Sequence, residues 1–197
     1  MTPFSGRSVG IRFEFTEELP SSECPPGHAG GALRMWLGGT PVWCGADGQP
    51  VLWTWLSFLD GLGRTWRWLT CETAYPIPIT PEHIGLLDEV LANRWDGMDD
   101  EQRDGEMDLM FDFNHRHNLA HLVRGISLPR VMALRSGDEV ELWSPCLSRP
   151  IRIAFVEFEE ELTKLGDILS QLTMQSSAEA PAAARLSWQK RGGCIII

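Results

Sequence analysis

A long helical stripe of apolar side chains runs through residues 155–172 of this sequence. Its members recur at spacings of three and four over about five helical turns. They are Phe155, Phe158, Leu162, Leu165, Ile168, Leu169 and Leu172. A stripe of this length is stable in water only when other elements cover it, so the rest of the chain must supply an apolar surface for it. The sequence therefore predicts a globular fold that packs this helix.

Shorter patterns predict the strands. Residues 9–15 alternate between apolar and polar side chains, which is typical of a strand with one buried face. Apolar runs flank the Gly38-Gly39 pair within residues 33–44, and a second pair of runs flanks residues 136–138 within residues 131–143. Both arrangements are typical of β-hairpins.

Three more helices are predicted between these strands. An apolar stripe indicates a helix over 51–69, and Thr80 as N-cap followed by Pro81 predicts a helix reaching residue 95. A further helix is expected from about residue 99 to 123, ended by Gly125. The fold class expected is α+β: an antiparallel sheet from the N-terminal strands and the late hairpin, packed by four helices.

Length and composition favour one domain with a tail. The chain has 197 residues, of which 43% are hydrophobic and 22% charged, and these ordinary values exclude wholesale disorder. Residues 176–187 are rich in Ser, Ala, Glu and Pro, so we predict one domain over 1–175, followed by a linker and apolar tail over 176–197. No signal-peptide pattern and no run of ~20 apolar residues is visible, so we expect a cytoplasmic protein.

Negative charge is concentrated in residues 82–113. This segment holds eleven Asp and Glu residues against Arg94 and Arg103, and so carries most of the net charge of −10. A solvated helical face would explain the cluster; alternatively, it binds a basic protein partner or imitates a phosphate backbone. The candidate binding residues are Asp99, Asp100, Glu101, Asp104, Glu106 and Asp108. Direct nucleic-acid binding is not expected of so acidic a chain.

The C-terminal tail runs from Lys190 to Ile197 and ends in Gly-Gly-Cys-Ile-Ile-Ile. The tail has three functional interpretations, and the alternative is that this end of the chain is incidental. In the first interpretation, the isoleucines form a docking peptide for a partner's groove or sheet edge. Alternatively, Gly192 and Gly193 resemble the precursor end of ubiquitin-like proteins, which a protease cleaves after the second glycine. In the third interpretation Cys194 is lipidated as in a C-a-a-X box, which would bring the protein to a membrane.

Two histidines provide a weak metal candidate. His117 and His121 are spaced i, i+4, which on one helix face suits zinc. A zinc peptidase of this type needs a glutamate after the first histidine as general base, and Asn118 occupies that position. The alternative is a structural role for both histidines in an amphipathic helix. We therefore predict no catalytic residue and no cofactor.

The sequence contains none of the common catalytic signatures. It has no nucleophile elbow, no Walker A motif and no dinucleotide fingerprint. It does have nine Trp against one Tyr, which indicates either a Trp-rich core or an exposed aromatic binding surface. Binding is therefore favoured over catalysis.

A longer pattern resembles a stretch of uncharacterised bacterial proteins, some of which carry an ImmA/IrrE-type metallopeptidase domain. The residues that carry the resemblance lie within about 50–172; they are 60–62, Trp66, 75–76, Phe111, Phe113, His117, 119–120, 125–129, 134–137 and Trp143. The resemblance implies an accessory domain of a bacterial regulatory or phage-defence system. The peptidase motif His-Glu-x-x-His is absent from this sequence, so no catalytic residue carries over.

Together these features lead to two hypotheses. The first is a non-enzymatic protein-interaction module of a bacterial regulatory or antiviral defence system. It would act through the acidic helical surface, through the tail, or through both. The second is a substrate, whose C-terminus is processed after Gly193 or modified on Cys194.

Overall fold

The computed structural model describes residues 10–16, 30–43, 51–123 and 127–176. In these residues it forms an α+β fold with two antiparallel sheets and four α-helices, which confirms the fold class expected from the sequence. None of the helices in these ranges is long and apolar enough to cross a bilayer.

The first sheet is built around its longest strand, β2. β1 (Ile11–Thr16) lies antiparallel along one edge of β2 (Gly30–Leu37). The other edge of β2 is shared by β3 (Thr40–Trp43) and β4 (Val51–Thr54), which pair with different halves of it. The predicted turn between β2 and β3 is present: Gly38 and Gly39 have φ values of 55° and 82°, which a two-residue hairpin loop requires.

The late hairpin forms a second sheet, whereas the sequence predicted that it would join the N-terminal strands in one. β5 (Met132–Ser136) and β6 (Glu139–Trp143) are the two predicted strands, and β7 (Ile151–Ala154) adds to β6. One face of this sheet joins the main core, and the members of that face are Ala133, Val140, Leu142 and Ile153. The opposite face carries a mixture of apolar and charged side chains, which becomes important for the site described below.

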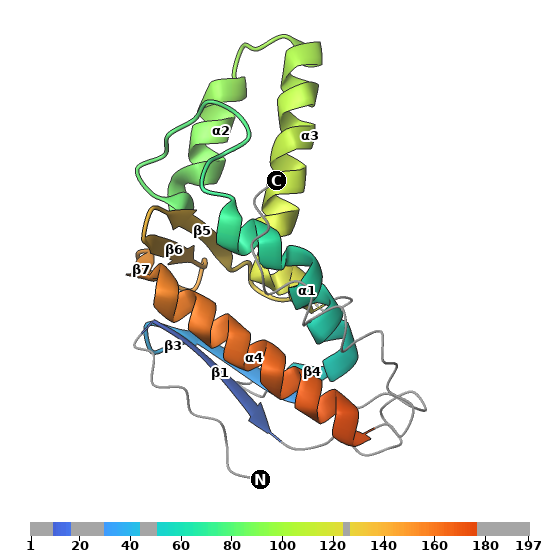
Figure 1. Ribbon diagram of the computed structural model, residues 1–197. Coiled ribbons are helices and arrows are strands. Elements are labelled where there is room, and N and C mark those ends of the chain that lie inside the picture. Colours follow the sequence, from blue (N-terminus) through green and yellow to red (C-terminus); the bar gives the residue numbers. More distant parts are fainter. Residues whose placement is uncertain (1–9, 17–29, 44–50, 124–126, 177–197) are drawn as a thin grey trace.

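Two of the helices lie side by side in the body of the molecule. α1 (Trp55–Cys71) and α4 (Phe155–Ser176) contact each other, and α4 crosses the first sheet (Figure 1). α4 confirms the helix predicted from the apolar stripe. Phe158, Leu162, Leu165 and Leu169 all lie in the main core.

The other two helices form a hairpin that projects beyond the second sheet (Figure 1). They are α2 (Leu87–Trp95), which follows the 3₁₀ turn η1 (Ile84–Leu86), and α3 (Asp100–His117), which precedes the 3₁₀ turn η2 (Leu119–Leu122). A small core holds the hairpin to the second sheet. It consists of Ile77, Ile84, Leu87, Leu91, Met110, Phe113 and Met132.

Three helix boundaries differ from the predicted ones. Residues 51–54 are a strand, because they pair with β2. Thr80 and Pro81 do not open a helix; helical structure begins at Ile84. α3 ends at His117 because Asn118 forms a bridge with Met132. At residues 51–54 and at Asn118 the chain pairs with distant residues, which periodicity does not report.

Candidate functional site

Most of the predicted acidic residues lie exposed on α3 or at its start. Asp99 is the N-cap, and its carboxylate accepts a hydrogen bond of 2.9 Å from the backbone N–H of Gln102. Asp100 pairs with Arg103 one turn further on. Acidic side chains here interact favourably with the helix dipole, so these residues stabilise the start of α3 as well as charging its surface.

Glu106 is different from the other five candidates because it is buried. Its side chain is only 11% exposed. It accepts hydrogen bonds from Nε and Nη2 of Arg94, at 2.7 and 2.6 Å, and from Nε1 of Trp95 at 3.2 Å. The hydrogen bonds from Arg94 lower the pKa of this carboxyl. Glu106 therefore joins α3 to α2 and does not contribute to the exposed acidic surface.

Large apolar side chains lie exposed among the carboxylates of α3. Phe111 is 71% exposed and Met107 is 45% exposed. These two residues are one turn apart, and Asp104 and Asp108 precede them by three residues each, so the four side chains share one side of the helix. We call these four residues, Asp104, Met107, Asp108 and Phe111, the α3 surface. It combines negative charge with apolar area that water still covers.

The two metal candidates do not share a helix face. His117 is the last residue of α3, whereas His121 lies in η2. The buried ring of His117 faces the carbonyl oxygen of Ala133 at 2.7 Å from Nδ1 and the carboxylate of Glu72 at 2.8 Å from Nε2. Burial lowers the pKa of His117, although both hydrogen bonds oppose that shift. Within the described ranges no group of three or more metal-ligating side chains occurs.

His121 contacts a different histidine. Its ring lies 4.4 Å from the ring of His115, measured between centroids. Burial and the charge of His115 lower the pKa of His121. The sequence spacing therefore gave the wrong partner for His121, because the end of α3 changes the direction of the chain between the two predicted ligands.

The tryptophans belong partly to the core. Trp43 and Trp66 are buried, in agreement with a Trp-rich core. Trp68 is 37% exposed, and the guanidinium carbon of Arg116 lies 4.6 Å from its ring centroid. Since a cation covers this ring, Trp68 does not add a bare aromatic face to the surface.

The proposed tail residues Gly192, Gly193 and Cys194 lie outside the described residues. Their docking, processing and lipidation therefore remain predictions.

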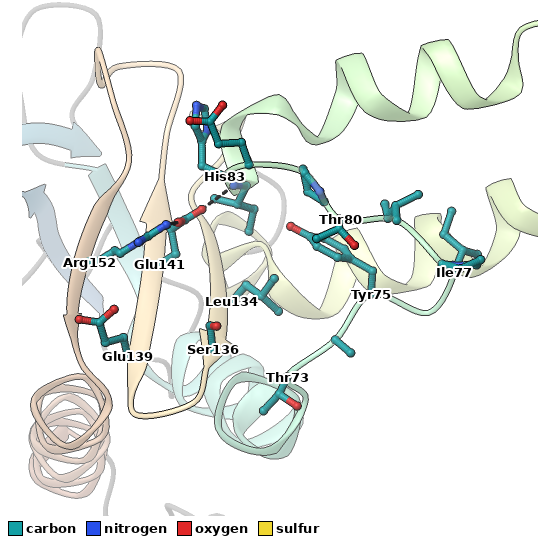
Figure 2. A pocket seen from close by; sticks show the side chains of 16 residues that line it. Thr73, Tyr75, Ile77, Thr80, His83, Leu134, Ser136, Glu139, Glu141 and Arg152 are labelled. Atoms are coloured by element: carbon teal, nitrogen blue, oxygen red, sulfur yellow. Dashed lines mark hydrogen bonds and ion pairs between the residues drawn. The ribbon is translucent and has the colours of Figure 1, made fainter.

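A pocket that the sequence did not predict lies between the second sheet and residues 73–84. Its volume is about 500 Å³, within the range common for small-ligand sites. Figure 2 shows Tyr75 on one wall and the β6 carboxylate Glu141 on the other. The remaining charged or polar side chains that line it include Glu82, His83, Ser136, Glu139 and Arg152.

Glu141 joins the two walls of the pocket. This side chain is 12% exposed and accepts hydrogen bonds from the backbone N–H of Ile84 and, at 3.0 Å, from Nε of Arg152. Burial and the Glu141 carboxylate raise the pKa of Tyr75, so its phenol stays protonated. The sequence carried one signal for this site, the alternation that places Glu139 and Glu141 on one face of the hairpin.

No protein-family model, no curated protein and no solved structure matches the chain significantly.

Proposed function

We propose that this chain is a non-enzymatic protein-interaction module that binds a basic partner through the α3 surface. The observation that carries the proposal is the exposure of Phe111, at 71%, beside Asp104 and Asp108. A phenylalanine ring stabilises a fold only when it is buried, so a ring this exposed contributes little to the fold of the chain itself. It is available for burial by a partner.

The composition of the α3 surface indicates the chemistry of that partner. Its carboxylates attract Lys and Arg side chains, while Met107 and Phe111 offer apolar area to bury. An amphipathic segment with both basic and apolar residues meets both requirements. Since α3 projects beyond the second sheet (Figure 1), such a segment can approach the exposed side of this helix.

We place this module in a bacterial regulatory or phage-defence system, as the resemblance of residues 50–172 implies. The tail provides a second contact in this proposal if its isoleucines dock on the same partner. The α3 surface is sufficient for the test that follows.

The test uses a fluorescein-labelled synthetic helix of Lys and Leu as the probe and measures its anisotropy on titration with the full chain. Phe111→Ala is expected to weaken binding about tenfold, as for a residue at the centre of an interface. The double variant Asp104→Asn, Asp108→Asn should weaken binding at low salt and reduce its dependence on salt.

The matched control is Val156→Ala. Val156 is also a large, exposed apolar side chain, at 58%, but it lies on α4. Its variant should bind the probe as the unaltered chain does. The proposal would be contradicted if Phe111→Ala and Val156→Ala lowered the affinity for the probe equally, or if salt left that affinity unchanged.

A further inference from the structure

The pocket between residues 73–84 and the second sheet has an excess of negative charge. Three carboxylates line it, from Glu82, Glu139 and Glu141, against the single guanidinium of Arg152. Glu141 is paired with Arg152, but neither Glu82 nor Glu139 forms an ion pair with any other described residue. The pocket can therefore accept a further positive charge without displacing an existing pair.

The geometry of β6 brings two of these carboxylates together. Glu139 and Glu141 are two residues apart on one strand, so their side chains leave the same face of the sheet about 7 Å apart. A guanidinium is planar and has five N–H donors, which allows it to bridge acceptors that a single ammonium donor cannot reach together. Arg152 shows that a guanidinium fits against Glu141 within this pocket.

The opposite wall offers the hydroxyl of Tyr75. The ring of Tyr75 is held by Phe113, with 5.1 Å between centroids, and its hydroxyl points across the pocket toward β6 (Figure 2). No hydrogen bond joins this hydroxyl to another described residue.

We propose that this pocket binds a guanidinium group at the end of an aliphatic chain, as in an arginine side chain. Glu139 and Glu141 accept its N–H donors, and the Tyr75 hydroxyl oxygen, which points toward β6, accepts a further one. The aliphatic part of the ligand lies along the apolar residues Ile77 and Ile79 of the segment that forms the outer wall. This inference does not depend on the α3 surface, because none of the four residues of that surface lines the pocket.

The experiment follows backbone amide shifts by two-dimensional NMR during titration of the full chain with Nα-acetyl-arginine methylamide. Saturable shifts are expected at Tyr75, Ile84 and Glu141, which line the pocket. The neutral isostere Nα-acetyl-citrulline methylamide should give none of them. n-Butylguanidine, which carries the same single charge, shows which part of the ligand is recognised: if it binds as tightly, the pocket recognises the guanidinium alone, and if it binds more weakly, the peptide backbone contributes.

Two glutamine variants test whether a carboxylate of the pocket contributes to binding. Glu139→Gln is expected to weaken binding about fivefold, since Glu139 is exposed and a partly solvated ion pair is of modest strength. Glu160→Gln removes an equal charge from an exposed position of α4 that does not line the pocket, and should leave binding unchanged.

Three results would overturn the proposal. They are the absence of saturable shifts in the pocket, equal binding of the citrulline compound, and equal weakening by Glu139→Gln and Glu160→Gln. Shifts confined to α3 would also overturn it, while supporting the acidic surface as the site for cations.

Discussion

At the scale of single residues, two helical glycines differ in what surrounds them. A Cβ on Gly61 in α1 would lie 2.8 Å from the carbonyl oxygen of Leu122 and 3.0 Å from its Cα. A Cβ on Gly105 in α3 would meet nothing within 4 Å. Gly61 therefore permits the close approach of α1 to η2, whereas Gly105 has no packing role and only lowers the helix propensity of α3.

These surroundings predict opposite effects of the same substitution. Gly61→Ala should lower the free energy of unfolding by about 1–3 kcal/mol, because the methyl group meets backbone that cannot rotate away. Gly105→Ala should raise it by about 0.5–1 kcal/mol through helix propensity. Urea denaturation followed by circular dichroism measures both. A stabilising Gly61→Ala would show that α1 and η2 are not packed this closely.

At the scale of elements, α3 is held by a narrow buried stripe. Its members are Glu106, Met110, Phe113 and His117. Two of these four side chains are titratable, so α3 is attached to the rest of the protein by paired polar groups as well as by the small core. The bidentate contact between Arg94 and Glu106, together with the hydrogen bond from Trp95 to Glu106, joins α3 to α2.

Removing that contact should loosen the α2–α3 hairpin. Glu106→Gln keeps the shape of the side chain but leaves the Arg94 guanidinium facing a neutral amide. We expect a lower melting temperature, together with faster amide exchange in α2 and α3 than in α4. Glu101→Gln is the control, because Glu101 is exposed on the same helix. If the two variants melt alike, the ion pair does not hold the hairpin.

At the scale of the whole molecule, His117 joins three parts of the fold. Its ring contacts Glu72, just after α1, and Ala133 in β5, while the residue itself ends α3. Arg116 also binds Glu72, at 2.9 Å. A neutral imidazole carries one N–H, so it can donate to only one of these two acceptors, whereas the protonated ring could donate to both. Burial nevertheless favours the neutral ring and lowers the pKa of His117 below its ordinary value of 6.5.

This shift predicts how stability depends on pH. Because the folded-state pKa of His117 lies below the unfolded value, its contribution is complete above the unfolded pKa. It is lost as the pH falls through the folded value. The melting temperature should therefore fall as the pH is lowered below about 6.5, and less steeply in His117→Gln. An NMR titration of the His117 ring provides the direct check, and a pKa above 6.5 would mean that the imidazolium, with both donors, is the buried form.

Local patterns were enough to predict much of this fold. The spacing of Phe158, Leu162 and Leu165 predicted α4, and the Gly38-Gly39 pair predicted the first hairpin. These predictions succeeded because periodicity shows which side of an element is apolar, and a glycine pair shows where the chain can reverse. The acidic character of α3 was also visible in the sequence, since charge needs no contact to be recognised.

Contacts between distant residues decided the remainder. Glu106 lies among exposed acidic neighbours in the sequence, but Arg94 and Trp95 bury it. The pocket lies between two parts of the chain that a hydrogen bond joins, from Ile84 to Glu141, which are 57 positions apart. The sequence by itself determined the faces, turns and charge of the elements, because each depends on residues within a few positions. Only the tertiary structure decided which faces meet, because that depends on how the whole core packs.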